Sequence, residues 1–165
     1  MPWNYHSRKE EHMKELSKNE MDTVLHKVND GVLALSNRAR PYCVPFGFVY
    51  VNDAVFLSMF PLGRKWEYFQ NNPEVCFNVF CWNADHTEWH SVVIDGEMEL
   101  VTDIQAIESV VRANIEKTGL DPGQYLEKRM EYYRKSIDNP KALKIFKIKA
   151  ASIGGRKMRT VSGES

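Results

Sequence analysis

The sequence predicts a mainly β domain, an antiparallel barrel or closed sheet with a few peripheral helices. Short apolar or alternating runs, rich in β-branched and aromatic residues, recur from Gly31 onward. Asn52-Asp53 separates two of these runs by the two residues of a tight hairpin turn. Few segments have a helical period, so we expect the helices to decorate the sheet rather than alternate with its strands.

Composition and charge limit the classes of partner. The chain has 165 residues, 43% of them hydrophobic, which is enough for one domain with its own core. Its 22 basic and 22 acidic residues balance, so we expect no global field that recruits nucleic acid or an anionic membrane. The charged N-terminus contains no apolar signal segment, and no apolar run is long enough to span a bilayer.

The cysteines predict a reducing environment. Cys43, Cys76 and Cys81 are odd in number, form no CxxC pair and lie in apolar runs that resemble strands. We interpret them as reduced core residues of a cytoplasmic protein.

The first half of the chain is expected to contain one helix and three strands. Residues 1–16 are polar and predict an N-terminal arm. Ser17 and Glu20 form a capping box, and the helix that they open should end at Asp30-Gly31. The strands are predicted over residues 32–36, 42–51 and 54–60.

Two residues interrupt the second of these strands. Pro45 lacks a backbone N–H and Gly47 lacks a side chain. This pair predicts an edge, a bulge, or a place where a flat ligand approaches the backbone closely.

The second half is expected to alternate strands with helices. A short helix from about Arg64 to Gln70 should turn Trp66 and Phe69 toward the core and end before Asn72-Pro73. Further strands are predicted over 75–82, 89–101 and 141–150. Helices should begin at a capping box of Thr102 and Gln105 and at Asp121-Pro122, and residues 158–165 read as a flexible tail.

Gly63-Arg64-Lys65 is the first candidate binding site. Helix starts usually attract acidic residues, because their unpaired N–H groups carry partial positive charge, yet here two cations occupy the first turn. A phosphate or a phosphorylated cofactor would fit in front of them. The alternative is a solvated helix start with two surface cations.

The histidines offer a rival metal or haem site. His86 and His90 are four residues apart, but the segment is predicted as a turn and a strand, in which His86, Glu88 and His90 would share one face. A closed ligand set is not visible, so we predict no metal site. A loop histidine and a strand histidine are the simpler interpretation.

Other catalytic patterns are weaker. Ser91 adjoins His90, but neighbours on a strand point to opposite faces, and the chain contains no GxSxG, GxGxxG or GxxxxGK[ST]. Ser91 is better interpreted as a strand serine that hydrogen-bonds a ligand or the backbone. Arg156, Lys157 and Arg159 follow a Gly-Gly turn and could either face solvent or reach an anionic cofactor.

Together these residues resemble a known family. The segments PYCVPFGFVYVNDAVFLSMFPLGRKWEYFQNNPEVCFNV and WHSVVIDGEMELV are similar to those of the pyridoxamine 5'-phosphate oxidase-related FMN-binding split-barrel proteins, and most similar to the nitroimidazole-resistance (Nim-type) branch. The likeness runs from about residue 8 to residue 157. It implies a six-stranded antiparallel split β-barrel that forms a homodimer, with FMN at the subunit interface.

The resemblance also implies roles for ten residues. Arg64 and Lys65 would hold the FMN phosphate, with the Gly63 backbone close to it. The residues implied to border the ring, the ribityl chain or the neighbouring strand are Pro45, Phe46, Gly47, Ser58, Met59, Phe60 and Ser91. Nim-type proteins usually carry His where this chain has Ser58, so the likeness supports the phosphate turn more strongly than nitroimidazole reduction.

The expected protein is therefore a single FMN-binding domain over residues 17–157. It would act as an oxidoreductase that passes electrons from a donor such as NAD(P)H to a small acceptor, with nitroaromatic compounds among the candidates. The alternative is a non-catalytic flavin or haem carrier, because no general acid or base stands out near the implied site. Its partners would be a second copy of itself and a small molecule.

Overall fold

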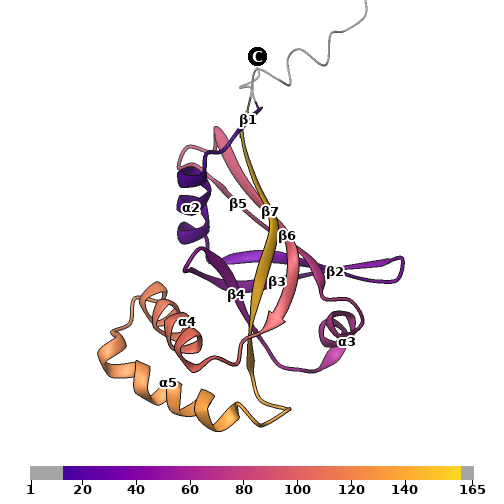
Figure 1. The fold of residues 1–165 in the computed structure, drawn as a ribbon. Coiled ribbons are helices and arrows are strands. Elements are labelled where there is room, and N and C mark those ends of the chain that lie inside the picture. The colour runs from indigo at the N-terminus through magenta and orange to yellow at the C-terminus, as the bar shows by residue number, and fades with distance from the viewer. Residues whose placement is uncertain (1–12, 161–165) are drawn as a thin grey trace, which may run out of the picture.

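The computed structural model describes residues 13–160. The strands are β1 (Met13–Glu15), β2 (Asp30–Asn37), β3 (Arg40–Val51), β4 (Ala54–Met59), β5 (Glu74–Trp82), β6 (Glu88–Leu100) and β7 (Lys144–Arg159). The helices are α2 (Lys18–Lys27), α3 (Gly63–Asn71), α4 (Ile104–Lys117) and α5 (Pro122–Ser136) (Figure 1). Most of the predicted arm and the end of the predicted tail, residues 1–12 and 161–165, lie outside the described part.

Six antiparallel strands close into a ring. Their order is β7-β4-β3-β2-β5-β6, and β6 pairs again with β7. The predicted class, a mainly β antiparallel barrel of the split-barrel type, is therefore confirmed. The seventh strand, β1, pairs with Arg156–Met158 at the far end of β7 and extends the sheet beyond the ring.

Two elements differ from the sequence-based prediction at the chain ends. Residues 13–15, assigned to the arm, form β1, because the exposed edge of β7 offers them hydrogen-bonding partners. β7 continues to Arg159, well past the predicted end at residue 150, because β6 pairs with it along this whole length. The pairing passes through a register shift at Asp95 and Gly96.

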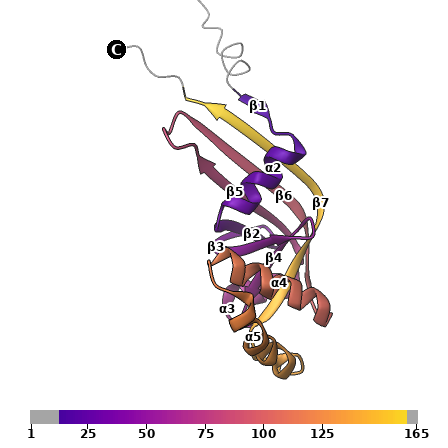
Figure 2. The same ribbon diagram turned by 90° about the vertical axis from the view of Figure 1, so that its left-hand side faces the viewer.

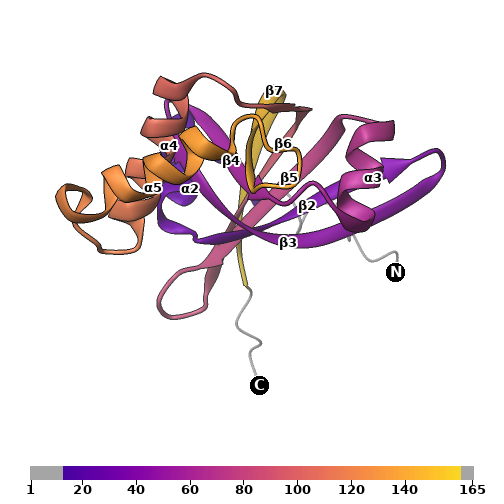
Figure 3. The ribbon, with the colours of Figure 1, turned by 90° about the horizontal axis from the view of Figure 1, so that it is seen from below.

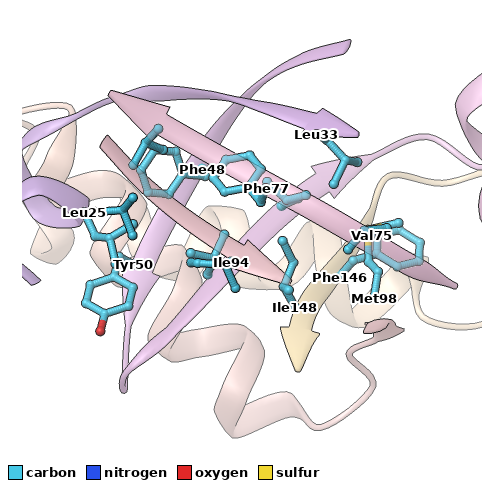
Figure 4. Close-up of a cluster of buried hydrophobic side chains, with 14 of the residues drawn as sticks. Leu25, Leu33, Phe48, Tyr50, Val75, Phe77, Ile94, Met98, Phe146 and Ile148 are labelled. Atoms are coloured by element: carbon cyan, nitrogen blue, oxygen red, sulfur yellow. The ribbon is translucent and has the colours of Figure 1, made fainter. Parts of the chain in front are cut away.

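The barrel interior is the main hydrophobic core. Side chains of every ring strand meet there, and Phe77 and Phe146 are fully buried. The Phe48 and Phe77 rings pack edge to face at 5.2 Å (Figure 4). Trp66 and Phe69 of α3 pack against Phe146, as the sequence predicts. Aromatic packing thus fixes α3 on the end of the barrel.

A second, smaller core lies outside the ring. Along β4, Val55, Leu57 and Met59 face the interior, whereas Phe56 and Ser58 alternate to the outer face. Phe56 packs there against α4 and α5, which lie on the opposite side of the molecule from α3 (Figure 3). The helical pair therefore covers the part of this outer face around Val49 and Phe56.

The predicted helix caps are partly correct. The Ser17 and Glu20 capping box is present at α2, and Asp121 caps α5. The cap of α4 is Asp103, whose carboxylate accepts from the Ala106 N–H, and not Thr102 as predicted. The adjacent carboxylate is the stronger acceptor and shifts the helix start by one residue.

The cysteine prediction also needs correction. Cys43 is exposed on β3, whereas Cys76 and Cys81 are half-buried. All three lie in strands, but Cys43 occupies an outward position of the alternating β3 pattern. Burial raises the pKa of the Cys76 thiol to about 11, with a further contribution from Asp95, so it is neutral at physiological pH.

An ion pair fastens α2 to β7, and both β1 and α2 lie along β7 (Figure 2). Lys157 Nζ donates to Glu20 Oε1 at 2.5 Å, and the Ser17 N–H donates to Glu20 Oε2 at 2.8 Å. The hydrogen bond from Lys157, followed by that from Ser17, lowers the pKa of Glu20 from 4.5 to about 2. The charged form of Glu20 is thus favoured by folding.

This pair predicts an acid-sensitive contribution to stability. A carboxyl group whose pKa falls on folding stabilises the protein above its unfolded pKa, and this contribution is lost as pH drops through the folded value. Glu20→Gln should therefore flatten the decline in the free energy of unfolding between pH 4.5 and about 2. Urea titrations across that window measure the slope. Lys157→Met should flatten it likewise, and an unchanged slope in both variants would contradict the assignment.

Candidate functional site

The start of α3 is an open, positively charged turn. Gly63 has φ +77°, a left-handed conformation that favours glycine, and a Cβ placed there would meet no described atom within 4 Å. Of the described side chains none caps this helix start, and its first turn holds no acidic residue. Arg64 is exposed and Lys65 is half-buried. Unpaired N–H groups therefore meet open space at Gly63, and two cations occupy the same helical turn.

Two tyrosines hold the Arg64 side chain. Its Cζ lies 4.3 Å from the centroid of the Tyr42 ring and 5.1 Å from that of Tyr68. Its Nη2 donates to the Tyr68 hydroxyl at 3.2 Å, and this bond raises the pKa of Arg64 above its ordinary value. Tyr68 is itself buried against the barrel core. The guanidinium is thus placed by stacking and one hydrogen bond before any ligand arrives.

Removing the Tyr68 hydroxyl tests this placement. Tyr68→Phe should weaken binding of a phosphate ligand at the α3 start by about threefold to tenfold, because the guanidinium loses its fixed orientation. Fluorescence titration with FMN measures the affinity. Tyr125→Phe, which removes an exposed hydroxyl on α5, is the matched control and should leave the affinity unchanged. Equal affinities in both variants would show that Tyr68 does not position Arg64.

The outer face of β3 is partly open near Pro45 and Gly47. β4 pairs with β3 only over Phe48–Val51, so the preceding residues have a neighbouring strand on the β2 side alone. The prediction of an edge at Pro45 is confirmed for this part of β3, because β4 does not pair with it. Proline suits such an edge, since it has no backbone N–H that would be left unpaired. Pro45, Gly47 and Ser58 are all exposed.

The structure brings Phe46, Gly47 and Ser58 to one cavity of about 920 Å³. Its other wall is formed by α4 and α5. Lys117 Nζ donates to the carbonyl oxygens of Val28 at 2.8 Å and Phe48 at 2.7 Å, and lies 4.1 Å from the centroid of the Phe48 ring. Burial lowers the pKa of Lys117 below its ordinary value.

The α5 side of the cavity carries a second cation and two phenols. Arg129 Nη1 donates to Asn114 Oδ1 at 2.9 Å, and the Tyr132 hydroxyl accepts from the Leu143 N–H at 3.2 Å. Burial raises the pKa of the Tyr133 phenol, and the nearby Ser58 hydroxyl acts in the opposite direction. Arg129, Tyr132 and Tyr133 all line the cavity.

Of the ten sequence-predicted residues, Phe46, Gly47 and Ser58 line this cavity, and the other seven lie apart from it. The Met59 side chain is buried in the barrel core, on the opposite face of β4 from Ser58, and Phe60 is 48% exposed between β4 and α3. Ser91 lies on β6, where its hydroxyl accepts from Asn78 Nδ2 at 2.9 Å. Within one chain the predicted site is thus divided among the α3 start, the β3–β4 face and β6.

The histidine and C-terminal candidates have other partners. His90 Nε2 lies 2.7 Å from Glu88 Oε1, whereas His86 stacks near Trp82 in the turn. Across residues 13–160 no group of three His, Cys, Asp or Glu side chains is arranged to hold a metal ion. The three C-terminal candidates pair with acids on β1, α2 and β6: Arg156 with Glu15, Lys157 with Glu20, and Arg159 with Glu88.

Sequence reasoning missed the cavity side chains of α4 and α5. Lys117 lies in the last turn of α4, where cations are common, so its position alone did not indicate a binding site. On α5, Arg129, Tyr132 and Tyr133 recur at spacings of three and four residues, which places them on one helical face. That spacing was the available signal, but it does not tell which surface the face covers.

Comparison with known proteins identifies a family that matches this chain. A family model described as pyridoxamine 5'-phosphate oxidase matches residues 17–157. No curated protein matches the chain. Of the described helices, none is both long and apolar enough to cross a membrane.

Solved structures share the fold. A protein from Bacteroides thetaiotaomicron assigned to 5-nitroimidazole antibiotic resistance is 20% identical with a TM-score of 0.67, over 88% of each chain. An FAD-binding protein from Mesorhizobium loti is 25% identical with a TM-score of 0.60, over 88% of this chain and 97% of that one. A heme-binding protein from Mycobacterium smegmatis is 13% identical with a TM-score of 0.59, over 79% of this chain and 50% of that one.

Proposed function

Since the chain belongs to the pyridoxamine 5'-phosphate oxidase family, whose model matches residues 17–157, we propose that it is an FMN-binding oxidoreductase. The observation that carries the proposal is the α3 start, where Arg64 and Lys65 flank open backbone N–H groups. When bound, FMN supplies a group that takes up electrons from a donor such as NAD(P)H and passes them to a small acceptor. Nitroaromatic compounds are among the candidate acceptors.

The α3 start fits a phosphate. Gly63 leaves open space at the turn, and its positive φ directs the chain into the helix without a side chain in the way. Arg64 offers further N–H donors besides the one held by Tyr68. A phosphate monoester would thus meet backbone N–H groups and two cations, which together match its charge and its three oxygens.

The outer face of β3 and β4 fits a flat ring. Gly47 presents no side chain there, and Ser58 offers a hydroxyl. Five peptide units separate Ser58 from Gly63, a span of at most about 17 Å, so the two proposed contacts belong to one short segment of the chain. A second copy of the chain would cover the open side of this face. The homodimer is therefore part of the proposal, as is Ser91 of β6 as a polar group near the ring.

The absorption spectrum of the protein as purified tests the proposal. We expect flavin bands, and we expect the denatured protein to release FMN that mass spectrometry identifies. Added FMN should raise the melting temperature of the apo protein, because ligand binding stabilises the folded state by mass action. Protein without flavin bands and without a thermal shift would argue against the proposal.

Non-catalytic carriage is the second candidate, because the cavity holds hydroxyls and cations but no free carboxylate or histidine among its described lining residues. A flavin-loaded sample that NADH and NADPH never reduce would favour it. The similar heme-binding protein motivates a haem titration as well, in which a Soret band lost in a His86 or His90 variant would favour haem. The three free cysteines support the cytoplasm as the proposed location.

A further inference from the structure

The cavity between the barrel and the α4–α5 pair has the size of a small-molecule site. Its volume of about 920 Å³ lies within the range typical of ligand pockets. Val49, Phe56 and Ile145 form an apolar floor that continues into the outer core. Gly47 and Ser58 lie at the same floor. A flat, largely apolar molecule would therefore rest on the β3–β4 face.

The charged groups of this cavity are all cationic. Lys117 and Arg129 line it, and the described lining residues include neither Asp nor Glu. Asp30 acts on Lys117 through its charge but lies outside that lining. Lys117 is fixed by two backbone carbonyls and by the Phe48 ring, so its charge cannot swing out to solvent without breaking these contacts. A ligand in the cavity would thus meet fixed positive charge.

The donors that remain free suit one carboxylate better than a phosphate. Lys117 has three N–H donors and commits two of them to the carbonyls of Val28 and Phe48. Arg129 donates one N–H to Asn114, and its other guanidinium N–H groups remain available. These planar donors can form two parallel hydrogen bonds with a carboxylate. A single planar fork above an apolar floor matches a carboxylate on a flat ring, whereas the α3 start offers the helix-start N–H groups that suit a phosphate.

Hydroxyl groups complete the polar side. Ser58 of β4 and Tyr133 of α5 both line the cavity, and each carries a hydroxyl group. Each can donate to a carbonyl or hydroxyl oxygen of a ligand placed between them. The cavity therefore offers an apolar floor, one anion-binding fork and one hydroxyl pair.

We propose that this cavity binds a flat, mainly apolar carboxylic acid, with its carboxylate on Arg129 near Lys117 and its ring on the apolar floor of Val49, Phe56 and Ile145, beside the surface proposed for the flavin ring. The binding of such an acid to the cavity is argued from the cavity alone. Its role as the reaction partner of the flavin rests on the proposed function. Arg129 is then the residue that determines specificity for an acid.

Binding of 2-naphthoate and its neutral counterpart 2-naphthamide tests the proposal. Calorimetry would be carried out on the full chain, with and without FMN. The wild-type protein should prefer the naphthoate by about tenfold to a hundredfold, the effect of a charge-assisted bidentate contact. Arg129→Met should abolish the preference. Arg134→Met, which removes an exposed cation of α5 paired with Glu127, is the matched control and should retain it.

One further variant keeps the possible outcomes distinct. Arg129→Lys keeps the charge but loses the fork, and it should retain only part of the preference even if Arg129→Met does not fold. Equal binding of both probes, or a preference that survives in both Arg129 variants, would overturn the proposal. Naphthoate preference through Arg129 in a protein that binds no FMN would uphold the cavity and reject the flavin proposal instead.

Discussion

Replacing Arg64 and Lys65 together by methionine is expected to weaken FMN binding by about 10²-fold to 10⁴-fold. Each cation would contribute a charge-assisted hydrogen bond to the phosphate, equivalent to about a tenfold to hundredfold change in affinity. The fold should survive, because Arg64 is exposed and α3 is held by Trp66 and Phe69. FMN fluorescence quenching measures the affinity, and circular dichroism confirms the fold.

A charge-matched control separates local contact from general attraction. Lys27→Met with Lys128→Met removes the same two charges from exposed positions on α2 and α5. This control should bind FMN as the wild type does, apart from a small effect at low salt. If both double variants lose affinity equally, the α3 start is not the phosphate site.

Gly96→Ala is expected to have the largest effect on stability. A Cβ at Gly96 would lie 2.2 Å from the Lys149 carbonyl oxygen and 3.0 Å from the Ala150 Cα, both backbone atoms of β7. Neither can move without breaking the ring pairing at the register shift beside Gly96. We expect a loss of about 3 kcal/mol or more in the free energy of unfolding, measured by urea denaturation.

Gly154→Ala is the matched control on β7. A Cβ there would meet no described atom within 4 Å. The same substitution should then leave stability unchanged or raise it by up to about 1 kcal/mol, because alanine restricts the unfolded chain more than glycine does. Similar losses in both variants would mean that the close approach of β6 to β7 does not limit stability.

Local patterns predicted the elements, and their failures have physical causes. Period-two alternation located β3, β4 and β5, and the aromatic face of α3 was visible from Trp66 and Phe69. β1 was missed because a three-residue strand has no pattern of its own and exists only through the edge that β7 offers. Such an element is determined by tertiary pairing rather than by its own residues.

The candidate site likewise combines residues that local sequence patterns predict with residues that only tertiary packing reveals. The α3 turn was predictable because charge at a helix start is a local anomaly. The cavity positions of Lys117 and Arg129 were not predictable, since they depend on which surface α4 and α5 cover. The burial of the Met59 side chain in the core likewise depends on which face of β4 turns inward. Whether the predicted ligand residues act together depends on the surface of the proposed second subunit. The sequence pattern of one chain does not describe how two copies meet.

The long strand β7 has a consequence for the order of folding. It is the last ring strand along the chain, and it pairs with both β4 and β6. Strands β2 to β6 can form hairpins early, but the two ends of that sheet stay unpaired until β7 docks between them. Ring closure therefore waits for contacts between distant parts of the chain, which fold slowly. During that delay β4 and β6 would expose edges open to pairing with other chains, so aggregation should compete with refolding most strongly at high protein concentration.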